Sequence, residues 1–125
     1  MSALIDEVIL GDLARLGQSP EFVERIIGVY LAEAGELVTA IEAAAVVGDY
    51  VALQDRAHAL HGTSANVGAL GVRALARALE YAAVEDLNTR GPIGVARLAP
   101  LFAATKGAMI AYLARGEANR VSPLP

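Results

Sequence analysis

The stretch from Ser19 to Gly48 constrains the fold more than any other part of the sequence. Its apolar residues recur every three or four positions, which is the spacing of one face of an α-helix. They are Phe22, Val23, Ile26, Ile27, Tyr30, Leu31, Ala34, Leu37, Val38, Ile41 and Ala45. Ser19 is a helix-capping residue, Pro20 suits the first helical position, and Gly48 is typical of the residue after a helix. The stretch therefore predicts one amphipathic helix of about seven turns, roughly 40 Å long.

The same spacing predicts further helices over residues 5–16, 50–67, 72–88 and 95–112. Asp49 is a suitable cap for the second of these. Pro100 lies inside the last one, where a proline removes a hydrogen bond, so we expect a kink or a restart there. The predicted connections are short, which favours antiparallel neighbours and an all-α, up-and-down bundle. Residues 1–115 are predicted to form this single domain, and residues 116–125, which lack an apolar stripe, a flexible tail.

Composition excludes several classes of protein. The mean hydropathy of +0.46 suggests a membrane protein, but the longest stretch without a charged residue, 57–72, contains two histidines, Thr, Ser, Asn and three glycines, which does not suit a membrane span. The first ten residues carry acids rather than the basic segment of an export signal, so no export signal is visible. The chain has no cysteine, which excludes a disulfide scaffold and a thiol nucleophile. A formal net charge of −4 argues against nucleic acid as a partner.

Both histidines lie on the predicted helix 50–67, and the helical period predicts where they point. At about 100° per residue, one face gathers the residues suited to the core. These are Leu53, Ala57, Leu60, Ser64 and Val67. His58 falls on the opposite side, toward solvent, and His61 falls on the flank. Gly62 and Ala65 lie beside His58, so small residues leave its imidazole open to a second protein.

Two plainer interpretations of these histidines stay open at this point. A histidine on a helix surface is commonly just a solvated side chain. The pair could instead bind a metal, but two imidazoles make only half a zinc site, and no third ligand is indicated, so no metal site is predicted. Gly62 does not fit the interpretation of a merely solvated histidine, because a glycine inside a helix costs about 1 kcal/mol of helix stability relative to alanine.

The segment AHALHGTSANVGA, residues 57–69, resembles the signature of histidine-containing phosphotransfer (Hpt) domains, approximately A-H-x-L-K-G-x-S-x-x-x-G. The matching residues are Ala57, His58, Leu60, Gly62, Ser64 and Gly68. Similarity extends to the opening segment Ile5 to Leu10, the S-P-E-F helix start, the Gly-Asp pair before the histidine helix, and Leu79-Glu80. The resemblance covers most of the chain.

This resemblance implies an antiparallel four-helix bundle with an additional short N-terminal helix. It implies that His58 is a phosphoacceptor, which takes a phosphoryl group from the aspartyl phosphate of a receiver domain and passes it to another receiver. The chain would then be a phosphocarrier rather than an enzyme, without a cofactor of its own, and Mg²⁺ would belong to the receiver. Receiver domains and a sensor histidine kinase are the implied partners. The chain is expected to be a monomer, either free-standing or the cytoplasmic module of a hybrid kinase.

His61 departs from the family pattern, which has lysine directly before the glycine. A lysine is a permanent cation, whereas an unperturbed imidazole, with a pKa of roughly 6.5, is only partly charged at pH 7. The hypothesis is that this exchange makes phosphohistidine stability or transfer more dependent on pH. His61 as the acceptor itself is the rival assignment, although only His58 has a glycine four residues later.

Other residues receive roles by family register or by charge. Glu80 is placed near the histidine, where it could accept a hydrogen bond from the imidazole. Arg56, Arg73 and Arg77 are candidates for docking an acidic receiver, and Ser64 is expected to bond back to its own helix. Two alternative functions remain: an adaptor that docks receivers without carrying phosphate, and a metalloprotein that uses both histidines.

Overall fold

The computed structural model describes residues 4–82, 84–89 and 91–121, and this part of the chain contains helices and no strand. The helices are α1 (Glu7–Gly17), α2 (Pro20–Val47), α3 (Tyr50–Asn66), α4 (Leu70–Glu80), α5 (Val84–Thr89), α6 (Gly91–Ala96) and α7 (Leu98–Val121). The predicted all-α class is confirmed.

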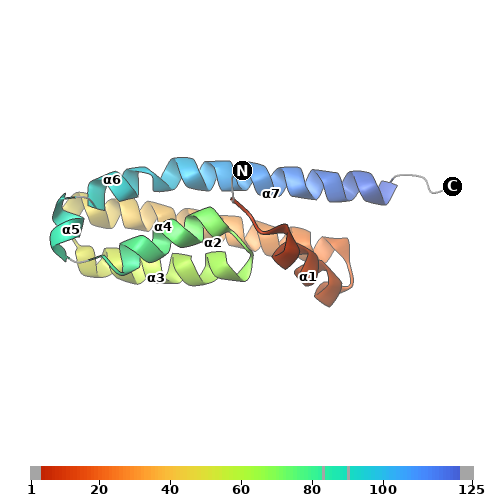
Figure 1. Cartoon of the computed structure of the whole chain (residues 1–125), viewed down its shortest axis with the longest axis horizontal. Helices are drawn as coiled ribbons and strands as arrows, with labels where there is room; N and C mark the ends of the chain where they lie inside the picture. The colour runs from red at the N-terminus through yellow and green to blue at the C-terminus, as the bar shows by residue number, and fades with distance from the viewer. Residues whose placement is uncertain (1–3, 83, 90, 122–125) are drawn as a thin grey trace.

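Four of these helices form the bundle. Figure 1 shows α2, α3, α4 and α7 lying side by side, with α1 at one end of the molecule and α5 at the other. Helix α3 packs against α2 and α4, whereas α7 packs against α2 and α4 on the side away from α3. The predicted up-and-down four-helix bundle with an additional N-terminal helix is confirmed.

The core is made by the apolar stripes that face one another between these helices. Its largest fully buried side chains include Leu10, Ile27, Tyr30, Ile41, Leu53, Leu60, Leu87, Leu98 and Met109. The ring of Tyr30 meets that of Phe102 edge to face, with centroids 6.5 Å apart, a favoured aromatic geometry. Helix α2 contributes along its whole length, because its buried residues recur every three or four positions from Val23 to Ala44.

The helix ends largely follow the capping residues. The Asp49 carboxylate accepts a hydrogen bond from the Ala52 N–H at 3.1 Å, which caps α3 as predicted. Ser19 does precede α2, but its hydroxyl makes no capping hydrogen bond. It donates instead to the Glu21 carboxylate at 2.7 Å. The proline at the first helical position fixes the start of α2 without that cap.

The fourth helix is shorter than predicted. It ends at Glu80, whereas the sequence predicted an end near Asn88. The Gln54 side chain on α3 donates to the Ala82 carbonyl at 2.7 Å. This bond gives a partner to a carbonyl that lies outside the helix. Residues 84–89 form the separate helix α5.

The predicted restart at Pro100 is present. Helix α6 ends at Ala96 and α7 begins at Leu98, so the proline lies in the first turn of α7, where it costs little. Helix α7 then continues past Gly116 to Val121, because a single glycine weakens a helix without ending it. The part of the expected tail from Gly116 to Val121 is thus helical, and residues 122–125 lie outside the described part of the chain.

Candidate functional site

Helix α3 presents His58 to solvent. Leu53, Ala57, Leu60 and Ser64 are its buried residues, and His58 lies on the opposite side with a side-chain exposure of 74%. His61 lies on the flank toward α4, with 23% of its side chain exposed. Both orientations agree with those predicted from the helical period.

The buried side of α3 is fixed by a hydrogen bond that the sequence did not predict. The Ser64 hydroxyl pairs with the Tyr30 hydroxyl of α2 at 2.9 Å, and both residues are buried. The expected bond from Ser64 back to its own helix is therefore wrong, because the neighbouring helix provides a better placed partner. Burial raises the pKa of Tyr30, and the bond from Ser64 offsets only part of that rise. Tyr30 stays neutral and anchors α3 against α2.

Glu80 joins the two histidines. One oxygen of its carboxylate contacts His58 Nδ1, and the other contacts His61 Nδ1 at 3.0 Å. The Glu80 side chain is only 11% exposed, so the carboxylate is held between α4 and α3. Because an ionised carboxylate only accepts hydrogen bonds, each Nδ1 carries the hydrogen. In the neutral ring, the Nε2 atom of His58 is then left with a lone pair, and this is the form that can act as a nucleophile.

The histidines also set the charge state of Glu80. Desolvation acts to raise the pKa of Glu80, but the hydrogen bonds from His58 and His61, with their Coulombic attraction, outweigh it. The net result is a pKa below the usual value near 4.5. Glu80 is therefore ionised throughout the physiological range and remains an acceptor for both imidazoles.

This lowered pKa predicts a change of stability with pH. A carboxyl group with a depressed folded-state pKa contributes stability above its unfolded-state pKa, and this contribution is lost as the pH falls through the folded-state pKa. We expect Glu80→Gln to be less stable than the wild type at pH 6, with a difference that shrinks as the pH falls below the usual glutamate pKa and through the lowered folded-state pKa. Denaturant unfolding at a series of pH values measures it. Glu24→Gln, an exposed glutamate of α2, is the control, and a difference for Glu80→Gln that does not vary with pH would contradict the prediction.

The surface around His58 is open. Gly62 is exposed and Ala65 is half-buried. A Cβ atom added to Gly62 would meet no described atom within 4 Å, so packing within this part of the chain does not require a glycine. The position one turn after His58 is thus kept free of side chain without an internal structural reason.

The three arginines predicted to dock a partner do not lie together. Arg77 is exposed on α4 one turn before Glu80, and Arg73 is half-buried one turn further back, so both border the histidine side. Arg56 lies on the other flank of α3, where it lines a surface groove with Glu33 and Glu36 of α2. Two residues apart on a helix, Arg56 and His58 point about 160° away from each other.

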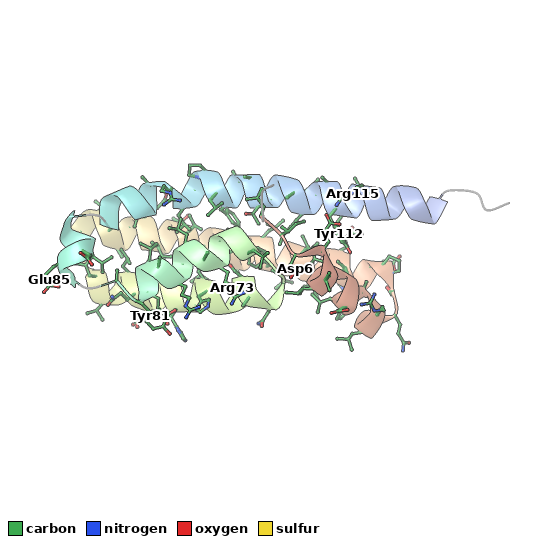
Figure 2. The ribbon with its side chains drawn as sticks, viewed as in Figure 1. Asp6, Arg73, Tyr81, Glu85, Tyr112 and Arg115 are labelled. Carbon is green, nitrogen blue, oxygen red and sulfur yellow. The ribbon has the colours of Figure 1, made fainter. Side chains whose placement is uncertain are left out.

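Two exposed apolar side chains near the site were missed from the sequence. Tyr81, next to Glu80, is 70% exposed, and Val51, two turns before His58 on the same side of α3, is 74% exposed. Figure 2 shows Tyr81 and Arg73 along the edge where α4 meets α3. The helical period places Val51 in line with His58, so the exposure of Val51 could have been predicted from the sequence. The exposure of Tyr81 could not, because it depends on where α4 ends.

Two features are absent from the described residues. Among the described residues, no group of three or more His, Cys, Asp and Glu side chains has an arrangement that could hold a metal ion. None of the helices in this part of the chain combines the length and apolar character of a membrane span.

The fold and the site define a helical-bundle protein that exposes one oriented imidazole. The family model of the Hpt domain matches residues 25–109, which is more than half of the chain. The chain therefore belongs to the family of histidine-containing phosphotransfer domains, and it is a phosphotransfer protein of two-component phosphorelays. This is a family of phosphocarriers rather than enzymes, whose members interact with receiver domains and kinases.

A solved structure agrees on the fold. The crystal structure of histidine-containing phosphotransfer protein B (HptB) from Pseudomonas aeruginosa PAO1 is similar to the chain with a TM-score of 0.82 and 22% sequence identity. The similarity covers 92% of this chain and 98% of the HptB chain. A comparison with curated protein sequences finds no significant match.

Proposed function

We propose that His58 is the phosphoacceptor of this chain, which takes a phosphoryl group from the aspartyl phosphate of one receiver domain and passes it to another. The observation that carries the proposal is the contact between His58 Nδ1 and Glu80 on an otherwise exposed imidazole. It directs the nucleophilic Nε2 atom away from the bundle, toward a docked partner.

The transfer is a displacement at phosphorus. The Nε2 lone pair of His58 forms the N–P bond, and the P–O bond to the receiver aspartate breaks, with its electron pair leaving on the carboxylate. The His58 ring gains positive charge, which the Glu80 carboxylate offsets at Nδ1, as a carboxylate does for a catalytic imidazole. When the phosphoryl group passes to the second receiver, the N–P bond breaks and its electron pair returns to Nε2. The His58 ring is then a neutral imidazole again. Mg²⁺ and the charge stabilisation on the phosphoryl oxygens are assigned to the receiver.

The docking surface is proposed to surround His58 on α3 and α4. Gly62 and Ala65 allow close approach, Val51 and Tyr81 supply apolar contact, and Arg77 faces an acidic partner. Arg56 is left out because it lies on the other flank. The chain is proposed to act as a cytoplasmic monomer, either free-standing or within a hybrid kinase.

Incubation with a phosphorylated receiver tests this function. We expect label on the chain that is labile in acid and stable in alkali, with a loss of at least about 1,000-fold in His58→Gln, because no other nucleophile has the same position. His61→Gln is the matched control and should retain label. Receiver binding without label would instead support an adaptor, and a metal-dependent activity of the isolated chain would support a metalloprotein.

A further inference from the structure

The Glu80 carboxylate is shared in a way that couples two imidazoles with different surroundings. His58 is largely exposed, whereas His61 is largely covered, and each donates from Nδ1 to one oxygen of the same carboxylate. A change of charge on either ring therefore alters the electrostatic environment of the other ring, because both are bound to one ionised carboxylate. This arrangement gives His61 a part in the chemistry although it does not face the partner.

We propose that His61 is a positioning residue that takes up a proton when His58 is phosphorylated, with Glu80 linking the two rings. The inference rests on the proposed function of His58, and it concerns how this chain accommodates the transferred group. This role of His61 differs from a direct contact with the phosphoryl oxygens, because His61 acts through the Glu80 carboxylate.

The charge balance gives the direction of the coupling. Attack by the neutral His58 ring leaves the ring with one positive charge and adds a phosphoryl group with two negative charges. The net change at the site is one additional negative charge, next to a carboxylate that is already ionised. The positive His58 ring acts against a second positive charge beside Glu80, but the two negative charges of the phosphoryl group outweigh it. Phosphorylation therefore favours the protonated form of His61, which is held at the other oxygen of Glu80. By linkage, a proton on His61 favours the phosphorylated form of His58 to the same extent.

The charged neighbours on each packed element are few. On α4, Arg77 lies one turn before Glu80 and Arg73 one turn further back, and Tyr81 follows Glu80 directly. On α3, Asp55 lies one turn before His58. Helix α2 packs on the opposite flank, where its charged groups Glu33 and Glu36 share a groove with Arg56. The arginines carry a fixed charge, so, apart from His58 and its phosphoryl group, His61 is the group at this site whose side-chain type changes its charge near neutral pH.

The test follows the protonation of His61 in the intact chain by NMR. The ring-proton resonances of His61 are titrated before and after phosphorylation of His58, with phosphoramidate or a phosphorylated receiver as the donor. We expect the His61 transition to move to higher pH by about one unit on phosphorylation. In Glu80→Gln, which keeps the shape of the side chain without its charge, we expect a shift of less than half that size.

The pH dependence of the phosphorylated state supplies a second readout. We measure the fraction of His58 that is phosphorylated at equilibrium with a receiver, in the wild type and in His61→Lys, which keeps its charge over this pH range. Between pH 6 and pH 8, this fraction should fall about threefold to tenfold more in the wild type than in His61→Lys. An unchanged His61 transition on phosphorylation, or equal pH profiles for wild type and His61→Lys, would overturn the inference and leave His58 as the acceptor. A phosphoryl group on His61, or none on either histidine with both donors, would overturn the proposed function as well.

Discussion

Gly62→Gln is expected to lower the rate of phosphoryl transfer from a receiver by at least about 100-fold, because a receiver that is held away from His58 loses much of the advantage of orientation. A glutamine one turn after His58 places a long side chain beside the imidazole. The structure leaves that position empty, since no described atom comes within 4 Å of an added Cβ. The loss should therefore come from blocked approach of the partner and not from disruption of the bundle.

Gly107→Gln is the matched control for this prediction. Gly107 also lies inside a helix, is exposed, and has no described atom near an added Cβ. It belongs to α7, which lies on the side of the bundle away from α3 (Figure 1). Both variants should gain about 0.5–1 kcal/mol in free energy of unfolding, and only Gly62→Gln should lose transfer. Equal transfer rates in the two variants would show that the space beside His58 is not used.

Gly68→Ala is expected to destabilise the fold by about 3 kcal/mol, the sum of a strained backbone and an overpacked contact. Gly68 has a φ of +72°, a conformation that costs alanine energy. An added Cβ would also lie 3.0 Å from the backbone oxygen of Asp6. The same glycine accepts a hydrogen bond from the Asp6 N–H at 2.7 Å, so the change would push the start of α1 away from the α3–α4 turn.

Gly48→Ala separates the two causes. Gly48 has a nearly identical φ of +71°, but no described atom lies within 4 Å of an added Cβ. Its substitution should cost about 1 kcal/mol, from backbone strain alone. Denaturant unfolding of both variants measures the difference, and an equal loss of stability would contradict the close contact between Asp6 and Gly68.

Features that depend on neighbouring residues were predictable from the sequence. The exposed position of His58 follows from the spacing of the buried residues of α3, which needs no knowledge of the other helices. The cap at Asp49 and the restart at Pro100 likewise depend on local backbone chemistry. These predictions succeeded because the physics that decides them acts within one or two turns.

Features that depend on contacts between distant residues were missed. Gln54 binds a carbonyl just beyond the end of α4, 28 positions away in the sequence. The partner of Ser64 is 34 positions away on α2. Family register placed Glu80 near His58, but only the packing of α4 against α3 shows that His61 shares its carboxylate. Such contacts need the tertiary arrangement, since several side chains of the right chemistry compete for each partner.

The position of the phosphoryl group on the chain tests the central proposal most directly. The chain is labelled with ¹⁵N in its histidine rings, phosphorylated by a receiver, and studied by ¹⁵N and ³¹P NMR at alkaline pH. We predict a single N–P bond at Nε2 of His58, with His61 unmodified and hydrogen still on Nδ1 of His58. A phosphoryl group on His61, or on Nδ1 of His58 where Glu80 lies, would contradict the account.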